Sequence, residues 1–449
     1  MGALAASLAI SLLSDSVLGR LDKAQEQRRQ EVLAALASSL NESQSAPKPE
    51  IAALKEEAGR VVEELLDRFP ENPSAWDAIA VLFVEWGKAD DAARAWQRSL
   101  ELDSAFGEAH YRLGLLARDR GEHQAAVDHF RKAIELGASS PALPEELSGA
   151  LMRVGRPEEA AGILEKEIRT HPRSVATLVL LGNAYGQLKD YEKSRKCYET
   201  ALEIAPDFST ACHGLATAYA RLGSEAKAKQ YLEKLKALKA AEEQVHRERL
   251  KKADDVAERR EGIAQFYAKV GQVYCEQGEP QPAEAYWRKV VQLAPNQAEG
   301  YLILAWFFEQ QDRPDEAVEV LKPFAEAQRE NVAVQVRIGS LYVGLERFEE
   351  AEKAFQSALE DTPGQGGGYA TLAKLYLRFD RKLPEARRLA AKAVELEPVA
   401  RNYFTLALVC RRAGDREGAR AALWRAVALE PDSAEYRRAY EAVEKGPGK

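Results

Sequence analysis

The sequence predicts an all-α fold, a solenoid of ten stacked pairs of antiparallel helices. Three observations predict it: prolines recur at intervals of 34 residues, small residues recur at fixed positions of that interval, and the pattern keeps its phase over most of the chain. With 449 residues, of which 46% are hydrophobic and 30% charged, the chain is too long for one ordinary core and too apolar to be disordered.

The period is marked by prolines that end the second helix of each pair. Pro172 and Pro206 are 34 residues apart, and Pro295 and Pro363 are 68 apart, which is two periods. Proline cannot continue a helix, so it stops each repeat. Counted from the first position of the first helix, the ten repeats begin at Pro73, Gly107, Pro141, Val175, Ser209, Ala264, Ala298, Val332, Gly366 and Ala400.

Two positions of the repeat are small because the two helices of a pair cross closely there. Position 8 is Ala80, Gly114, Ser148, Gly182, Ala216, Gly271, Ala305, Gly339, Ala373 and Ala407. Position 20 is Ala92, Ala126, Ala160, Ser194, Ala228, Ala283, Ala317, Ala351 and Ala419, with Ala386 after a one-residue insertion in repeat nine. Six first helices end at a glycine, where a left-handed residue is least costly: Gly87, Gly121, Gly155, Gly223, Gly278 and Gly414.

The clearest copy of the pattern is Leu181-Gly182, followed by Tyr185, Tyr198, Ala201 and Pro206. It resembles the tetratricopeptide repeat, a helix–turn–helix unit of 34 residues. The resemblance implies a right-handed superhelix in which positions 2, 5, 9, 12 and 13 of the first helix, helix A, line a concave groove. It covers ten repeats, about three quarters of the chain.

We expect six segments. They are an apolar and charged N-terminal helical segment with a linker (1–50), a capping helix (51–72), five repeats (73–242), a charged helical insert (243–263), five further repeats (264–433), and a C-terminal capping helix with a tail (434–449). From Ser224 to Glu261 there is no glycine or proline, so one long helix or two helices both fit the insert. Either a solvated face or an arm that docks a partner would explain its mixed charges.

The N-terminus is apolar from Gly2 to Leu13, which is shorter than the roughly 20 residues that a membrane-spanning helix needs. No Lys or Arg precedes this stretch, contrary to a signal peptide. Three interpretations stay open: a helix that packs on a partner or a membrane through residues 1–18, the remnant of a signal or anchor, or a frayed end. The cytoplasm is the favoured location, with a membrane-associated or periplasmic location as the alternative.

No pattern for enzyme chemistry is present. There is no P-loop, nucleophile elbow, H-E-x-x-H or kinase motif, and the four cysteines form no C-x-x-C pair. His110, His123 and His129 lie in one repeat, but no fourth metal ligand accompanies them. We therefore expect no cofactor and no metal. The formal charge of −8 argues against a partner that is a nucleic acid.

Two groups of groove positions implied by the resemblance are the candidate partner-binding residues. The apolar group is Leu302, Trp306, Val336 and Val343, and the basic group is Lys374, Arg378, Arg401, Arg411 and Arg412. Trp306 is large for a solvent-facing position, so it is either an interface anchor or packs on the neighbouring helix A. From Gly366 to the end the net charge is +6, whereas residues 1–365 carry −14, which favours an acidic partner.

Two functions of related proteins are not supported by the residues. Chaperone-binding members pair Lys at position 5 with Asn at position 9, and here Asn183 is accompanied by Val179. Glycosyltransferase members carry an asparagine ladder at position 6, and this chain has none. We predict a non-catalytic scaffold that binds a protein or peptide in its groove. The alternatives are a membrane-attached assembly or envelope-biogenesis factor anchored through its N-terminal segment, and a partner-dependent enzyme subunit. Nothing in the sequence specifies an oligomeric state.

Overall fold

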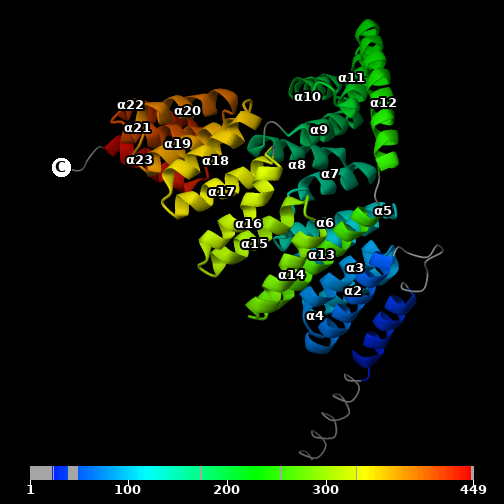
Figure 1. Ribbon diagram of the computed structural model, residues 1–449. Helices are drawn as coiled ribbons and strands as arrows, with labels where there is room; N and C mark the ends of the chain where they lie inside the picture. The colour runs from blue at the N-terminus through cyan, green and yellow to red at the C-terminus, as the bar shows by residue number, and fades with distance from the viewer. Residues whose placement is uncertain are drawn as a thin grey trace, which may run out of the picture. The chain divides into compact units, whose positions relative to one another are not determined.

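The computed structural model describes residues 23, 25–38, 49–171, 174–252, 255–329 and 331–445, and all their regular structure is helical (Figure 1). One helix covers residues 25–38. The others are α2 (Pro49–Arg68), α3 (Pro73–Glu85), α4 (Ala89–Leu102), α5 (Gly107–Asp119), α6 (His123–Glu135), α7 (Leu143–Arg153), α8 (Pro157–Thr170), α9 (Val175–Gln187), α10 (Tyr191–Ile204), α11 (Ser209–Arg221), α12 (Glu225–Lys252), α13 (Asp255–Glu276), α14 (Pro280–Leu293), α15 (Ala298–Gln310), α16 (Pro314–Ala327), α17 (Val332–Gly344), α18 (Phe348–Asp361), α19 (Gly366–Arg378), α20 (Leu383–Leu396), α21 (Ala400–Arg412), α22 (Arg416–Leu429) and α23 (Ala434–Lys445).

The ten helix pairs from α3/α4 to α21/α22 confirm the predicted all-α solenoid of repeats. Eight of the ten first helices begin at the residue that the period predicts. The exceptions are α7, which begins two residues after Pro141, and α13, which begins nine residues before Ala264. The early start of α13 follows from the insert, where no glycine or proline interrupts the helix.

In the four repeats that have glycine at position 8, this glycine and the aromatic residue at position 24 explain how the helix pair packs. A Cβ atom on Gly114 would lie 2.6 Å from Cε1 of Phe130, and one on Gly271 would lie 2.5 Å from Nε1 of Trp287. Phe130 and Trp287 are almost completely buried. The ring of the second helix therefore fills the space that the missing side chain of the first helix leaves.

The turn after helix A needs a left-handed residue in every repeat, including those without glycine. In six repeats this residue is a glycine with φ between 73° and 79°: Gly87, Gly121, Gly155, Gly223, Gly278 and Gly414. At the equivalent turns Lys189 has φ 62° and Glu346 has φ 57°. Non-glycine residues are strained in this region because Cβ crowds the following carbonyl oxygen.

We expect Glu346→Gly to stabilise the chain by about 1 kcal/mol, because glycine removes the strain of the left-handed turn after α17. Urea denaturation of the variant and the parent protein measures the difference. Gly155→Ala, at the equivalent turn after α7, is expected to lose a similar free energy. A Glu346→Gly protein with an unchanged or lower unfolding midpoint would contradict the expectation.

The chain forms two compact units. Unit 1 comprises residues 1–168 and 173–294, and unit 2 comprises residues 169–172 and 295–449. The sequence places the division at the insert, between repeats five and six, whereas the compact units divide one repeat later, after Ala294. Unit 1 therefore holds six repeats and unit 2 holds four.

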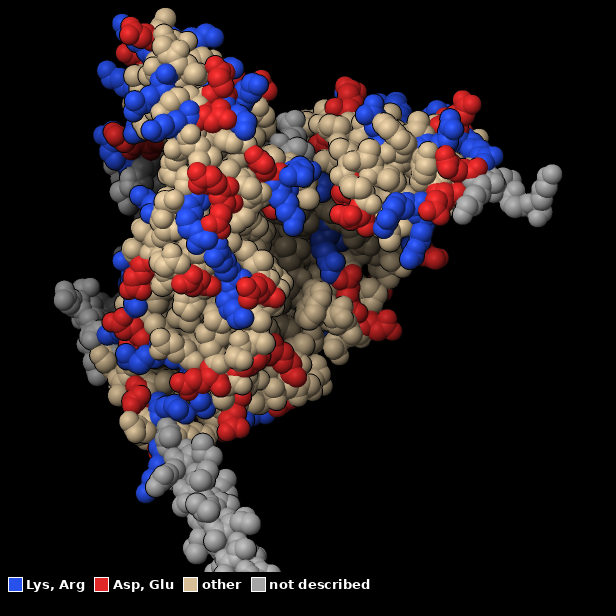
Figure 2. Space-filling model, turned by 180° about the vertical axis from the view of Figure 1, so that it is seen from behind, with Lys and Arg blue, Asp and Glu red and all other residues tan. Residues whose placement is uncertain are grey.

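The sixth repeat lies in unit 1 because the insert turns the chain back. The described residues of the insert belong to two helices, α12 and α13. The first half of α12 pairs with α11, and residues 239–245 of its second half are exposed. Its 28 residues span about 42 Å. Figure 2 shows Lys and Arg interspersed with Asp and Glu around α12, the highest part of unit 1 in that view.

Helix α13 packs antiparallel to α3, the helix A of the first repeat (Figure 1). Lys269 of α13 forms an ion pair of 2.9 Å with Asp77 of α3, whose side chain is only 2% exposed. Nine residues earlier in α13, Arg260 pairs with Glu50 of α2. The rings of Tyr274 and Phe69 lie edge to face, 5.3 Å apart. Helix A of the first repeat is thus covered by helix A of the sixth.

Short helices cover both ends of the repeat array. The helix over residues 25–38 lies on the first repeat and buries Val32 and Leu36. At the other end, Tyr436 of α23 packs on Phe404 with ring centroids 4.9 Å apart. The apolar N-terminal stretch, and with it the predicted membrane contact of residues 1–18, lies outside the described residues. No helix in the described part of the chain combines the length and apolarity that crossing a membrane requires.

Candidate functional site

The nine candidate residues of unit 2 lie on its four first helices, α15, α17, α19 and α21. All five basic residues are exposed: Lys374, Arg378, Arg401, Arg411 and Arg412. Of the apolar group, Leu302, Val336 and Val343 are half-buried. Each helix A thus presents its candidate side chains on the side away from the core of its pair.

Trp306 differs from the aromatic residues beside it in α15. Its side chain is 45% exposed, whereas Phe307 and Phe308 are each 1% exposed. Those two phenylalanines enter the core of the pair, and Trp306 faces the other way. Half of its surface still contacts the protein, so both packing on its surroundings and anchoring of a partner are compatible with its position.

The basic group is only partly neutralised by neighbouring carboxylates. Arg412 pairs with Asp380, and Arg401 lies 3.6 Å from Glu397. The side chains of Lys374, Arg378 and Arg411 form no ion pair or hydrogen bond with any residue that the structure describes. Three exposed cations on α19 and α21 are therefore available to an anionic group.

A second candidate site lies in unit 1, and the sequence did not single it out. It is a cavity of about 590 Å³ between α7, α9 and α11, the first helices of repeats three, four and five. Its lining includes Arg153, Gln187 and Arg221, which end these three helices at the same repeat position, 13. The signal that could have found it is the arginine at position 13, a groove position, in both repeat three and repeat five.

Asn183 in the middle of this cavity is held by a buried tyrosine. The hydroxyl of Tyr198 donates a hydrogen bond of 2.7 Å to Oδ1 of Asn183. Burial raises the pKa of the Tyr198 phenol to about 12, so the hydroxyl keeps its proton at neutral pH. Because Oδ1 is occupied as acceptor, the two N–H groups of the amide remain as donors on this wall of the cavity.

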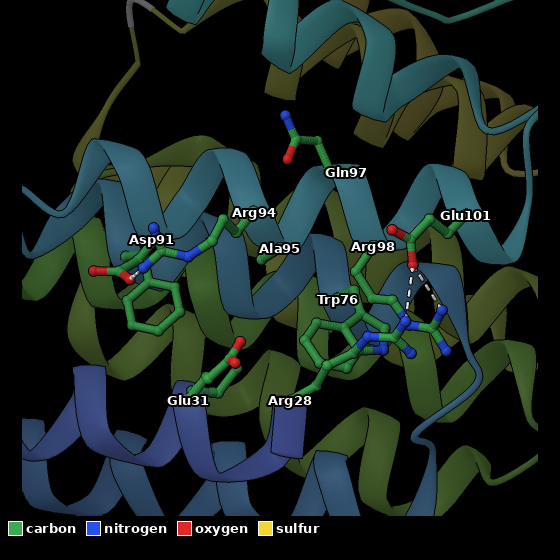
Figure 3. A pocket seen from close by; sticks show the side chains of 11 residues that line it. Arg28, Glu31, Trp76, Asp91, Arg94, Ala95, Gln97, Arg98 and Glu101 are labelled. Atoms are coloured by element: carbon green, nitrogen blue, oxygen red, sulfur yellow. Dashed lines mark hydrogen bonds and ion pairs between the residues drawn. The ribbon is translucent and has the colours of Figure 1, made fainter. Parts of the chain in front are cut away.

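A second cavity lies between the helix over residues 25–38 and the first repeat, and its charges are balanced (Figure 3). Arg94 pairs with Asp91, and both Arg98 and Arg28 reach Glu101, at 2.9 and 3.6 Å. Its volume of about 200 Å³ is small for a ligand pocket. We assign it to imperfect packing of the terminal helix.

Two of the three histidines of the second repeat form a pair. Nδ1 of His110 lies 3.1 Å from Nδ1 of His129, within hydrogen-bonding distance. The described residues contain no group of three or more His, Cys, Asp or Glu side chains arranged to hold a metal ion. Burial and the neighbouring His129 lower the pKa of His110, and burial lowers the pKa of His129.

This pair is expected to make the protein less stable in mild acid. Since the pKa of both imidazoles is lowered on folding, the unfolded chain takes up protons at a higher pH than the folded one. Stability is therefore full above about pH 6.5 and falls as the pH falls below it. Lys132 opposes protonation of His110, and Asp128 favours that of His129. Thermal unfolding from pH 7.5 to 5 should show a smaller decrease for His129→Gln than for the parent or for the control His213→Gln.

Several known proteins are similar to parts of this chain. Among curated relatives, it is 32% identical over 149 residues to the protein O-mannosyl-transferase Tmtc3 of Drosophila melanogaster, which is 33% of this chain and 16% of that protein. It is 26% identical over 183 residues to anaphase-promoting complex subunit 3 of Schizosaccharomyces pombe, 41% of this chain and 28% of that protein. The chain spans less than a third of the length of either relative.

Solved structures with a similar fold include YrrB, described as a TPR protein with an unusual peptide-binding site, at 19% identity and a TM-score of 0.37 over 39% of this chain and 91% of that chain. Another is yeast Tom70, at 14% identity and a TM-score of 0.36 over 88% of this chain and 95% of that chain. Sequence profiles of the tetratricopeptide repeat match residues 78–141, 175–208, 209–242, 271–332 and 308–366, together about half of the chain. The chain is a member of the tetratricopeptide repeat family.

Proposed function

We propose that this protein is a non-catalytic scaffold that binds a protein or peptide partner on the concave helix-A face of unit 2. The observation that carries the proposal is the row of exposed cations on α19 and α21 that lack carboxylate partners, in the same unit as the exposed Trp306. Membership of a repeat family built around an open groove supports it.

Each group has a separate role in this proposal. Trp306 supplies a large, rigid apolar surface, and truncation of such residues usually costs more affinity than truncation of their neighbours. Arg411 and Arg412, with Lys374 and Arg378, attract an acidic segment and set its orientation, because complementary charge governs encounter and register more than final affinity. An acidic partner is therefore the expected class.

The test compares affinity capture and mass spectrometry for the parent protein, Trp306→Ala and the double variant Arg411→Glu/Arg412→Glu. Proteins lost from both variants are the expected partners, and their capture should weaken with salt. The chain offers matched controls outside the groove: Trp424 on α22 is 53% exposed, and Arg437 and Arg438 on α23 are exposed. Partners that bind all variants equally would place the binding face elsewhere.

A further inference from the structure

The cavity of unit 1 has an alternating pattern of charge at its rim. Arg153, Gln187 and Arg221 end α7, α9 and α11, so a cation, a neutral amide and a second cation follow one another along three neighbouring helices. None of the residues that line this cavity is Asp or Glu. The apolar side chains of Met152 and Leu180 also take part in the lining.

Neither arginine is neutralised by a residue that the structure describes. Arg153 and Arg221 are exposed, and their side chains form no ion pair or hydrogen bond within the described part of the chain. Arg195 on α10, by contrast, pairs with Glu192 at 2.9 Å and with Glu199 at 2.7 Å. Two unpaired guanidinium groups around a cavity without carboxylates favour an anionic occupant.

Two glycines of the lining are not required by the packing of the protein. A Cβ atom on Gly149 would meet no other atom within 4 Å, and one on Gly186 would meet only Oγ of Ser194, at 3.6 Å. Glycine inside a helix costs about 1 kcal/mol relative to alanine. The space that these two residues leave open is where the backbone of a ligand can approach α7 and α9 closely.

We propose that this cavity binds an extended peptide segment with two acidic side chains about five residues apart, one at Arg153 and one at Arg221. Helices packed side by side are about 8–10 Å apart, so α7 and α11, separated by α9, are about 16–20 Å apart. An extended peptide covers about 3.3 Å per residue, which gives the spacing. The Asn183 amide donates to the peptide backbone between the two carboxylates, and Met152 and Leu180 contact its apolar side chains.

This is a binding site in unit 1 with its own residues, and it does not depend on the proposed function of unit 2. The probes are fluorescein-labelled dodecapeptides of Gly, Ser and Leu with amidated C-termini, carrying two Glu residues at spacings of two to eight positions. Fluorescence anisotropy with the full chain measures affinity at low and high salt. A glutamine series, a phosphoserine series and a series with a single free C-terminal carboxylate distinguish the possible anions.

The expected result is an affinity maximum at a spacing of about five residues between the two Glu residues. The glutamine series should bind at least about tenfold more weakly, because a good charge pair usually contributes about a factor of ten in affinity. Arg153→Glu and Arg221→Glu should each reduce affinity by a similar factor, and Trp306→Ala should leave it unchanged. Equal binding of the glutamine series, no dependence on spacing, selective binding of the phosphoserine or free-terminus series, or no binding of any series would overturn the proposal.

The glycines supply a second test that a folding defect cannot imitate. Gly149→Ala/Gly186→Ala is expected to raise the unfolding midpoint, because alanine favours the helix, while peptide affinity falls at least about fivefold as two methyl groups fill the cavity. Gly162→Ala in α8, where a Cβ atom also meets nothing within 4 Å, is the control outside the cavity. It should raise the midpoint without changing affinity. Unchanged affinity of the double variant would contradict close approach of a peptide backbone.

Discussion

Replacing Lys269 with alanine should destabilise unit 1 by about 2–4 kcal/mol, because it leaves the buried carboxylate of Asp77 without its counter-ion. Asp77 is 2% exposed and also accepts a hydrogen bond of 2.8 Å from Nε1 of Trp96, so it cannot turn toward solvent. The same ammonium group lies 3.8 Å from Glu108 of α5. Glu108 keeps a second partner, Arg112 of its own helix at 3.0 Å, so the loss of Lys269 falls mainly on the buried Asp77.

Chemical denaturation gives the loss of stability, and hydrogen exchange locates it. The amides of α13 and α14 should exchange faster in Lys269→Ala, whereas those of unit 2 should not change. Adding Asp77→Asn removes the buried charge while keeping an acceptor for Trp96, so the double variant should recover a large part of the loss. Lys392→Ala, which breaks an exposed pair with Glu395, should cost less than about 0.5 kcal/mol. A Lys269→Ala protein as stable as this control would show that the contact of α13 with α3 is not held by the ion pair.

Gly214→Val should destabilise unit 1 by about 3 kcal/mol, because the new side chain has no space beside Tyr198. A Cβ atom on Gly214 would collide with the Tyr198 ring. The ring has little room to move away, because Gly182 also lies against it: a Cβ atom on Gly182 would be 2.7 Å from Cε1 of Tyr198. Tyr198 is thus enclosed between helix A of its own repeat and helix A of the next.

A double-mutant cycle tests the cause of this effect. Tyr198→Ala alone should also be destabilising, because it opens a cavity, but in the Tyr198→Ala background Gly214→Val should cost much less than alone. Gly162→Val is the matched control, since it introduces the same side chain where no neighbour lies within 4 Å. If the two losses simply add, the collision with Tyr198 is not the reason. Gly214→Val and Tyr198→Ala should each also weaken peptide binding at Asn183, because Tyr198 orients the Asn183 amide.

The sequence predicted the helix pairs well because the information that defines them is local. Gly182 and Tyr198 lie in one repeat and form one contact, so their spacing alone indicates that the two helices cross there. The packing of α13 on α3 could not be predicted in this way. Every helix A carries a similar apolar pattern, and nothing in the spacing of Asp77 and Lys269 indicates which helices pair across the chain.

The candidate site in unit 1 was missed for a related reason. Residues 1–365 carry a net charge of −14, which hides two arginines, Arg153 and Arg221, whose side chains form no ion pair with any residue that the structure describes. Whether an arginine is neutralised depends on side chains from other repeats, as Arg118 of α5 shows by pairing with Glu146 of α7 at 2.6 Å. Net charge is a sum over a whole segment, whereas the binding of a ligand depends on the balance of positive and negative side chains at the binding site. Partner binding by the nine candidate residues of unit 2 stays a proposal, and the capture experiment tests it.

The contact between α13 and α2–α3 also changes how unit 1 should fold. In an ordinary repeat array all contacts are local, so the chain can nucleate anywhere and fray from either end. Here Arg68 and Tyr274, 206 residues apart in sequence, share a hydrogen bond of 3.2 Å. Closing so long a loop costs entropy before any contact forms, and folding slows as contacts become more distant in sequence. The first repeat, normally the end that frays, becomes tied to the last repeat of its unit, so unit 1 should unfold as a single cooperative block.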